Sequence, residues 1–263
     1  MNDLAFSHLT SSPLPPVTKQ ALDSSRLMLG VLGGMGPLAG ATFSSRLVQL
    51  TDAHSDQEHI PVLMCNDPRI PDRSSAYLLG TEDPLPAMLR SLRMLESCGA
   101  GLIVIPCNTA HLWYEQLARS TSLTILHIVD AVITDLKRQG IHEGPIGIMG
   151  TAATLKLELY QNALTAAGYT PLLLNDQETH DYCLEPIRRV KQGQLQASYE
   201  PAEYGVRLLA HRGARAVVLG CTELPLAVPH DRRPGLGVVV TDSIDALALQ
   251  AIDYIHAREL IAI

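Results

Sequence analysis

The sequence predicts an α/β fold in which two pseudo-symmetric lobes each hold a mostly parallel β-sheet flanked by helices. Two observations support this fold class. From Leu27 onward, short aliphatic runs alternate with longer amphipathic stretches, which is typical of β-α-β units. In addition, residues 29–37 (LGVLGGMGP) resemble residues 146–154 (IGIMGTAAT), and residues 98–109 (CGAGLIVIPCNT) resemble residues 212–223 (RGARAVVLGCTE). Two motifs that recur in the same order indicate an internal repeat of about half the chain.

Eight runs of β-branched or aliphatic residues have the length and the flanking residues of strands. Eight short strands fit two small sheets better than a single small lobe. In chain order we predict strands at Leu27–Leu32, Pro61–Cys65, Leu102–Pro106, Thr124–His127, Pro145–Met149, Thr170–Leu174, Arg215–Leu219 and Gly237–Val240.

The stretches between these runs carry helix start and stop signals. One helix is predicted to begin at Pro84, after the capping residue Asp83, and to end at Cys98 before Gly99. Three further glycines, Gly140, Gly168 and Gly213, stand where a helix commonly ends in a left-handed residue.

Composition excludes several classes of protein. The net charge of −7 comes from scattered acidic residues, so we expect no binding to nucleic acid or to an anionic membrane. No apolar run approaches the roughly 20 residues of a membrane-spanning helix. Five cysteines without a C-x-x-C pair favour neither a disulfide framework nor a zinc site, and we expect a cytoplasmic protein. Residues 1–26 are rich in Ser, Pro and Thr and are predicted to form a flexible extension rather than a secretion signal.

The repeated motifs place Cys107 and Cys221 directly after predicted strands. Ligands of open parallel sheets bind beyond the carboxyl ends of the strands, and a following helix N-terminus favours a thiolate. A lone buried cysteine is usually a small core residue, as we expect for Cys65, Cys98 and Cys183. For the repeated pair, followed by polar residues in both copies, we favour a chemical role.

Other candidates are less specific by sequence alone. The loop GGMGP (residues 33–37) follows a strand and can bind a small anion such as a carboxylate, but it lacks the dinucleotide and nucleoside triphosphate signatures. Arg69, Arg73 and Lys191 could each bind a carboxylate or be solvated surface groups. His111, four residues after Cys107, could act as a base, although helix packing or capping is the more common role.

The motifs GVLGGMGPLAG, DQEHIPV, NDPRIPDR, IPCNTAH and GCTEL together resemble the aspartate/glutamate racemase superfamily, and within it the aspartate racemase branch. The resemblance extends from about Leu27 to the C-terminus. It implies two α/β lobes with the active site in the cleft between them, and a homodimer. It also implies that the C-terminal strand and helix return to the first lobe, which gives lobe 1 as residues 27–127 plus 238–263 and lobe 2 as residues 128–237.

The resemblance also implies roles for particular residues. Cys107 and Cys221 match the two catalytic cysteines, and Arg73 and Lys191 match a carboxylate-binding arginine and a lysine near the second cysteine. The remaining predicted substrate-binding residues come from the glycine loop and the two cysteine motifs, and they are Met35, Gly36, Asn108, Thr109, Thr222 and Glu223. No metal and no cofactor, including pyridoxal phosphate, are implied.

The predicted function is therefore the interconversion of L- and D-aspartate, with glutamate as a second candidate substrate, by a two-base thiol/thiolate mechanism. Two opposed groups suit this reaction because one removes a proton from Cα while the other returns a proton to the opposite face. Three alternatives remain open: a related isomerase or lyase of the maleate isomerase or hydantoin racemase type, a racemase of broad specificity, and a non-catalytic amino-acid binder. Aspartate-specific members often have an aromatic residue at the position of Ile187, so this isoleucine makes the prediction of aspartate as substrate less specific.

Overall fold

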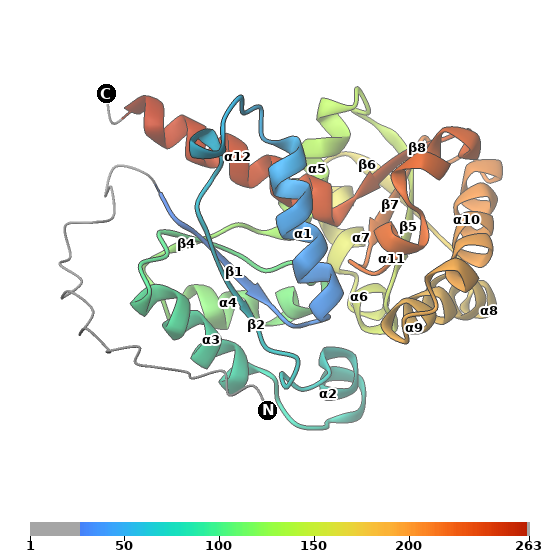
Figure 1. Ribbon diagram of the computed structural model, residues 1–263. Coiled ribbons are helices and arrows are strands. Elements are labelled where there is room, and N and C mark those ends of the chain that lie inside the picture. Colours follow the sequence, from blue (N-terminus) through green and yellow to red (C-terminus); the bar gives the residue numbers. More distant parts are fainter. Residues whose placement is uncertain (1–26, 262–263) are drawn as a thin grey trace, which may run out of the picture.

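Two four-stranded parallel sheets form the framework of the protein in a computed structural model that describes residues 27–261 (Figure 1). The strand order is β2-β1-β3-β4 in the first sheet and β6-β5-β7-β8 in the second, so the same order occurs twice. This confirms the predicted α/β class and the internal repeat. The expected flexible extension, residues 1–26, lies outside the described residues.

The first sheet is built from the N-terminal half of the chain. Its elements, in order, are β1 (Leu29–Gly33), α1 (Pro37–Leu50), the 3-10 helix η1 (Asp56–Glu58), β2 (Val62–Asn66), α2 (Arg73–Leu79), α3 (Leu85–Ser97), β3 (Leu102–Val104), the 3-10 helix η2 (Thr109–Trp113), α4 (Tyr114–Ala118) and β4 (Thr124–Ile125). Helix α5 (Ile128–Arg138) then leads to the second sheet.

The second sheet repeats this plan. Its elements are β5 (Gly144–Gly150), α6 (Ala152–Lys156), α7 (Leu159–Ala166), β6 (Tyr169–Leu173), α8 (Asp176–Thr179), the π-helical turn η3 (His180–Leu184), α9 (Glu185–Lys191), α10 (Leu195–His211), β7 (Ala216–Gly220), α11 (Leu224–Ala227), the 3-10 helix η4 (His230–Leu236), β8 (Val239–Asp242) and α12 (Ser243–Ile261). All eight predicted strands are present, with ends shifted by a few residues.

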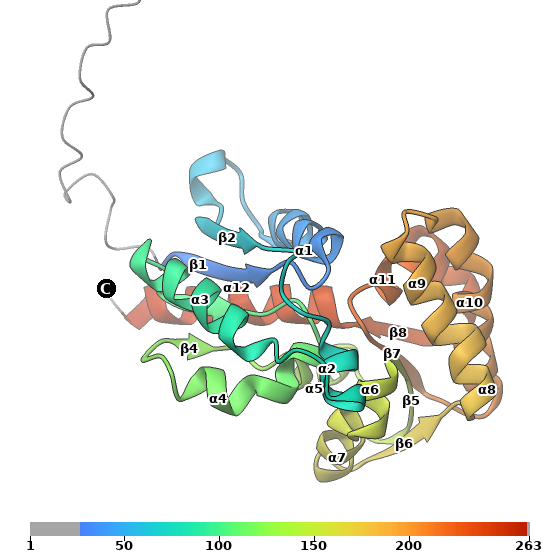
Figure 2. The same cartoon turned by 90° about the horizontal axis from the view of Figure 1, so that it is seen from below.

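The C-terminal strand corrects one expectation. The resemblance placed this strand in the first lobe, but β8 pairs in parallel with β7 and completes the second sheet. Only the helix that follows reaches the first half, since α12 packs against both α1 and α5 (Figure 2). In this pairing, Val239 to Asp242 lie beside Ala216 to Leu219.

Local signals explain several helix ends. Helix α3 begins after Pro84, where the carboxylate of Asp83 accepts a hydrogen bond from the backbone N–H of Leu85 at 3.0 Å. It ends before Gly99, which adopts a φ of +95° that a side chain would disfavour. The predicted helix-ending glycines at 140, 168 and 213 also have positive φ.

A central core joins the two halves, and each half has a second core on its outer side. Side chains from β1, β3, α1 and α5 of the first half mix with side chains from β5, β7, α7 and α12 in one continuous cluster, with Phe43, Val129, Tyr160 and Leu247 fully buried. The two outer clusters are separate. Burial of this central layer holds the sheets in a defined relation to each other.

No helix within residues 27–261 combines the length and the apolar character needed to cross a bilayer.

Candidate active site

Both repeated cysteines point to the same face as alternate residues of the strands that precede them. Alternate residues of a strand point to one face, and Cys107 continues the residues of β3 that pack against α3. Cys221 likewise continues the residues of β7 that pack against α10. The two thiols therefore leave equivalent faces of the two sheets, at the carboxyl ends of the strands.

A single small cavity between the halves is lined by both cysteines. Its volume is about 20 Å³, which is room for about one water molecule. Nine of the ten predicted site residues line it: Met35, Arg73, Cys107, Asn108, Thr109, Lys191, Cys221, Thr222 and Glu223. The tenth, Gly36, lines a wider cavity of about 550 Å³ that shares four wall residues with the small one, namely Asp72, Arg73, Lys191 and Glu223.

The glycine loop holds its shape through one close backbone approach. Gly34 has a φ of +91°, and a Cβ placed on it would lie 2.1 Å from the carbonyl oxygen of Asp67. A side chain is therefore excluded here. The loop leads into α1, whose first residue is Pro37 as predicted, and Gly36 sits at its N-cap. The start of this 14-residue helix faces the wide cavity, where its free N–H groups favour an anion.

The thiol of Cys221 donates a hydrogen bond to a carboxylate. Its Sγ lies 3.0 Å from Oε2 of Glu223, and both residues are only 4% exposed. Burial raises the pKa of the Cys221 thiol well above its usual value, and the negative charge of Glu223 adds to this increase, while the charge of Lys191 acts in the opposite direction. Cys221 is therefore held as the neutral thiol.

His111 contacts the backbone of Cys107 and makes no hydrogen bond to its sulfur. Its Nε2 accepts a hydrogen bond from the backbone N–H of Ile128 at 3.1 Å, so the ring proton is on Nδ1, which donates to the carbonyl oxygen of Cys107 at 2.9 Å. Burial, and then the neighbouring His127, lower the pKa of His111 to about 3. The ring is neutral and structural, in agreement with the more common role expected from the sequence.

Arg73 is buried at the start of α2 and has an unused donor. It is 7% exposed, and its Nη1 donates to the carbonyl oxygens of Ile70 and Pro71 at 3.1 and 2.8 Å. Its Nε is buried without a hydrogen-bond partner. A carboxylate bound in the cavity would satisfy that donor. Arg69, the other candidate arginine, has a side chain that is 88% exposed and pairs with Asp67 instead.

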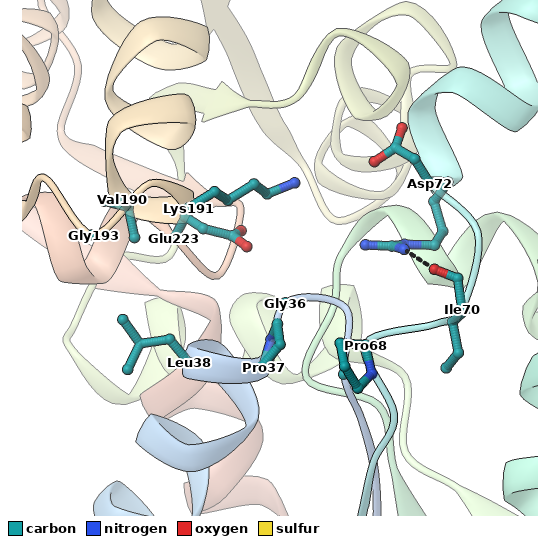
Figure 3. A pocket seen from close by; sticks show the side chains of 12 residues that line it. Gly36, Pro37, Leu38, Pro68, Ile70, Asp72, Val190, Lys191, Gly193 and Glu223 are labelled. Carbon is teal, nitrogen blue, oxygen red and sulfur yellow. Dashed lines mark hydrogen bonds between the residues drawn. The ribbon is translucent and has the colours of Figure 1, made fainter.

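Lys191 and Asp72 approach the cavity from opposite halves. In Figure 3 the Lys191 side chain extends from α9 toward Asp72, with Glu223 beside it. Burial works against the charged ammonium, but Glu223, Cys221, Cys107 and Asp72 together outweigh it and raise the pKa of Lys191. The lysine is thus a cation held between acidic groups of both halves.

Asn108 and Thr109 link the halves as well as lining the cavity. Asn108 accepts a hydrogen bond from the hydroxyl of Tyr160 at 2.5 Å and donates one to Ser243 at 2.8 Å. The hydroxyl of Thr109 lies 3.0 Å from that of Thr151 and 3.2 Å from that of Thr154. These bonds cross from the first half to the second beside the cysteines.

Sequence reasoning missed three residues that line the small cavity: Asp72, Ser74 and Thr151. Asp72 and Ser74 flank the predicted Arg73, so a helix start at this arginine was the available signal. Thr151 occupies the position in the second half that Gly34 occupies in the first, and the repeat could have identified it.

One cluster away from the cysteines has the residue types of a metal site. Ligand atoms of His230, Asp242 and Asp245 lie within 4.8 Å of one another. Asp245 is already bound by Arg46 at 2.7 Å, and Asp242 lies 2.7 Å from Arg233. Two guanidinium charges balance the two carboxylates, so the arrangement is an ion-pair network.

Comparisons with known proteins identify the family of the chain. A family model described as Asp/Glu/Hydantoin racemase matches residues 32–251, which is most of the chain. The broad specificity amino-acid racemase RacX of Bacillus subtilis is 29% identical over 147 residues, or 54% of this chain. The chain matches 62% of the length of RacX.

Solved structures show the same architecture. An aspartate racemase of Picrophilus torridus superimposes with a TM-score of 0.77 at 29% identity, covering 88% of this chain and 94% of that one. An aspartate racemase homologue of Pyrococcus horikoshii superimposes with a TM-score of 0.68 at 21% identity, covering 88% and 99% of the two chains. The second likeness concerns the fold alone.

Proposed function

The chain belongs to the Asp/Glu/hydantoin racemase family, and we propose that it is a cofactor-independent amino-acid racemase in which Cys107 and Cys221 act as paired base and acid. The observation that supports this most is the shared cavity, because it receives one thiol from each half of the molecule. A racemase needs one group on each face of the substrate carbon.

The proton balance of the proposed reaction is simple. The thiolate of Cys107 takes the proton from Cα, and the thiol of Cys221 gives its proton to the opposite face, so that the product has the inverted configuration. The reverse reaction uses the same sulfurs in exchanged roles and restores the starting state. Each turnover leaves the total number of protons unchanged.

The Cα proton is much less acidic than a thiol, so the site has to stabilise the carbanion. Arg73, with its unused Nε, is the proposed partner of the substrate carboxylate, where negative charge accumulates as the proton leaves. Lys191 and the N–H groups at the start of α1 add positive potential in the same region. Carbanion stabilisation by these groups needs no pyridoxal phosphate.

Substrate binding requires the space between the cysteines to widen. The cavity of about 20 Å³ there holds about one water molecule, which is too little for an amino acid. The wider cavity beside it offers the route inward. Closure would then exclude water from the charged groups and strengthen their interactions.

Aspartate is the first proposed substrate, because Arg73 and Lys191 provide two cationic contacts for two carboxylates. Broad specificity is the second candidate. The wide cavity of about 550 Å³ leaves space for larger side chains, and the similarity to RacX supports this candidate. Incubation with single L-amino acids followed by chiral analysis of the products distinguishes the two.

The test of the mechanism compares Cys107→Ala and Cys221→Ala with Cys98→Ala in deuterated water. Cys98 is an exposed free cysteine and is the matched control. We expect the parent and the Cys98 variant to form both enantiomers with deuterium at Cα, and each of the other variants to lose at least about 100-fold in rate. A near-parental rate in either would rule out the two-thiol scheme.

A further inference from the structure

The two cysteine motifs differ at the second residue after the cysteine, which is Thr109 in the first motif and Glu223 in the second. Thr109 turns its hydroxyl toward the hydroxyls of Thr151 and Thr154. Glu223 turns a carboxylate oxygen toward the sulfur of its own motif, at 3.0 Å. The repeat is therefore symmetric in its strands and unsymmetric in what surrounds its thiols.

The carboxylate of Glu223 is fixed in this orientation by its surroundings. The residue is 4% exposed and stands at the N-cap of α11. A Cβ on Gly36 of the glycine loop would lie 3.1 Å from its Oε1, so the loop closes against it. The hydroxyl of Thr222 lies 3.5 Å from Oε2. These contacts and its burial hold the carboxylate beside the sulfur.

We propose that Glu223 is a positioning residue that keeps Cys221 in its thiol form in the resting protein, so that the two cysteines start each cycle in different protonation states. This inference rests on the proposed racemase function. The proposed role differs from the substrate-binding role predicted for Glu223 from the sequence, and the experiments below distinguish the two.

The proton stays on sulfur because a carboxylate is a far weaker base than a thiolate. Ordinary pKa values differ by about four units, a factor of about 10⁴ in favour of the S–H···O⁻ arrangement. Glu223 thus accepts a hydrogen bond without taking the proton, and its charge opposes a second negative charge on the neighbouring sulfur.

Other titratable groups face Cys221 and are included in this assignment. Lys191 of α9 acts in the opposite direction to Glu223. Tyr160 of α7 is fully buried, and its raised pKa keeps it neutral. Across the cavity lie Cys107, Asp72 and Arg73 of the first half. Of these groups, Glu223 is the one that accepts a hydrogen bond from the thiol.

The asymmetry predicts a specific kinetic pattern. At equilibrium the two enantiomers are equally stable, so the ratio of the two kcat/KM values is fixed at one in any variant. The individual KM values can differ, because each enantiomer binds one of the two protonation forms of the enzyme. The KM for the enantiomer that binds the minor form is raised in inverse proportion to the fraction of enzyme in that form. Glu223→Gln keeps the size of the side chain and removes its charge.

The first measurement is the thiolate absorbance titration of the full chain. The signal of Cys221 is obtained by subtracting the titration of the Cys221→Ser variant from that of the parent. The same subtraction is made in the Glu223→Gln background, with the double variant as the reference. We expect the change to lower the titration midpoint of Cys221 by about one unit or more. Glu115→Gln, which alters an exposed carboxylate, is the control and should leave the midpoint in place. An unmoved midpoint in the Glu223 variant would overturn the assignment.

The second measurement is KM for both enantiomers. We expect Glu223→Gln to change the ratio of the two KM values roughly tenfold, in line with one pKa unit, and Glu223→Asp, which retains the charge, to restore most of the parental ratio. An equal rise of both KM values would show a substrate-binding role and overturn the proposal. If the parent interconverts no enantiomers, the racemase function fails, whereas the absorbance titration still decides the role of Glu223.

Discussion

The hydroxyl of Tyr160 donates a 2.5 Å hydrogen bond to the side-chain oxygen of Asn108, and this bond ties the residue after the first cysteine to a helix of the opposite half. Tyr160 is fully buried in the central core. The same amide donates to Ser243, whose hydroxyl donates to the carbonyl oxygen of Leu219, one strand position from the second cysteine motif. One chain of hydrogen bonds thus connects the surroundings of both cysteines.

Tyr160→Phe should weaken this connection. It leaves the buried oxygen of Asn108 without a donor, so we expect a loss of about 1–2 kcal/mol in the free energy of unfolding. Tyr204→Phe alters an exposed tyrosine and should stay within about 0.5 kcal/mol of the parent. Urea unfolding of the two variants decides the point, and equal midpoints would contradict a structural role for this hydroxyl.

If Arg73 binds the substrate carboxylate as proposed, Arg73→Lys should raise KM by about 10- to 100-fold, because a lysine cannot reproduce the planar guanidinium and its unused Nε. The loss corresponds to about 1.5–3 kcal/mol of charged hydrogen bonding. Arg69→Lys is the matched control, since its side chain is exposed and pairs with Asp67. Steady-state kinetics on both variants test this, and similar KM values would separate Arg73 from substrate binding.

Gly34→Ala should displace the glycine loop. The added Cβ would meet the carbonyl oxygen of Asp67 at 2.1 Å, in a backbone conformation that already disfavours a side chain. We expect a loss of several kcal/mol, on the scale of strained core substitutions. Gly80→Ala has a similar positive φ of +67° but meets nothing within 4 Å, so it should cost about 1 kcal/mol. Thermal unfolding of the pair separates steric clash from backbone strain.

Acid should destabilise the protein through His111. Its pKa is about 3 in the folded state and 6.5 as its ordinary value. Between these two pH values the imidazole is protonated in the unfolded chain but neutral in the folded chain. The free energy of unfolding therefore decreases as the pH falls below 6.5. The slope is about 1.4 kcal/mol per pH unit for one such group, and His127, also lowered by burial, acts in the same direction.

His111→Gln should make the stability curve shallower between pH 6 and pH 4, while His256→Gln, on the exposed side of α12, should leave its slope unchanged. Urea unfolding at several pH values measures both slopes. A parental slope in the His111 variant would place the acid sensitivity elsewhere.

Asp245→Asn should loosen the contact between α12 and α1. Burial raises the pKa of this carboxyl, but hydrogen bonds from His230 and Arg46 outweigh it and bring the value to about 2. Its stabilisation is therefore present above pH 4 and is lost as the pH falls toward 2. We expect a loss of about 2 kcal/mol near neutral pH. Asp253→Asn, in an ion pair whose carboxylate is 62% exposed, should have little effect.

The strands and the cysteine positions could be predicted because local patterns specify them. An aliphatic run of five residues indicates a strand, whichever strand it pairs with. Because side chains alternate between the two faces of a sheet, the run also indicates which face the cysteine after it points to. The same pattern carries no information about the neighbouring strand. Residues 237–240 were therefore recognised as a strand, but their place beside β7 instead of in the first lobe was missed.

The partners of the polar site residues could not be read from local sequence. Asn108 meets Tyr160 and Ser243, which are 52 and 135 positions away in the chain. Glu223 was recognised as a polar residue beside a cysteine, but the direction of its carboxylate depends on the closing of the glycine loop against it. Such contacts arise from packing between halves, and residue type alone does not determine them.

The matching order of strands in the two sheets bears on how the two halves can differ. The same framework places a cysteine beyond the end of β3 in one half and beyond the end of β7 in the other. Because both halves belong to one polypeptide, a substitution in one copy of the repeat leaves the other copy unchanged. Each cysteine can therefore have neighbours of its own, as Thr109 and Glu223 show.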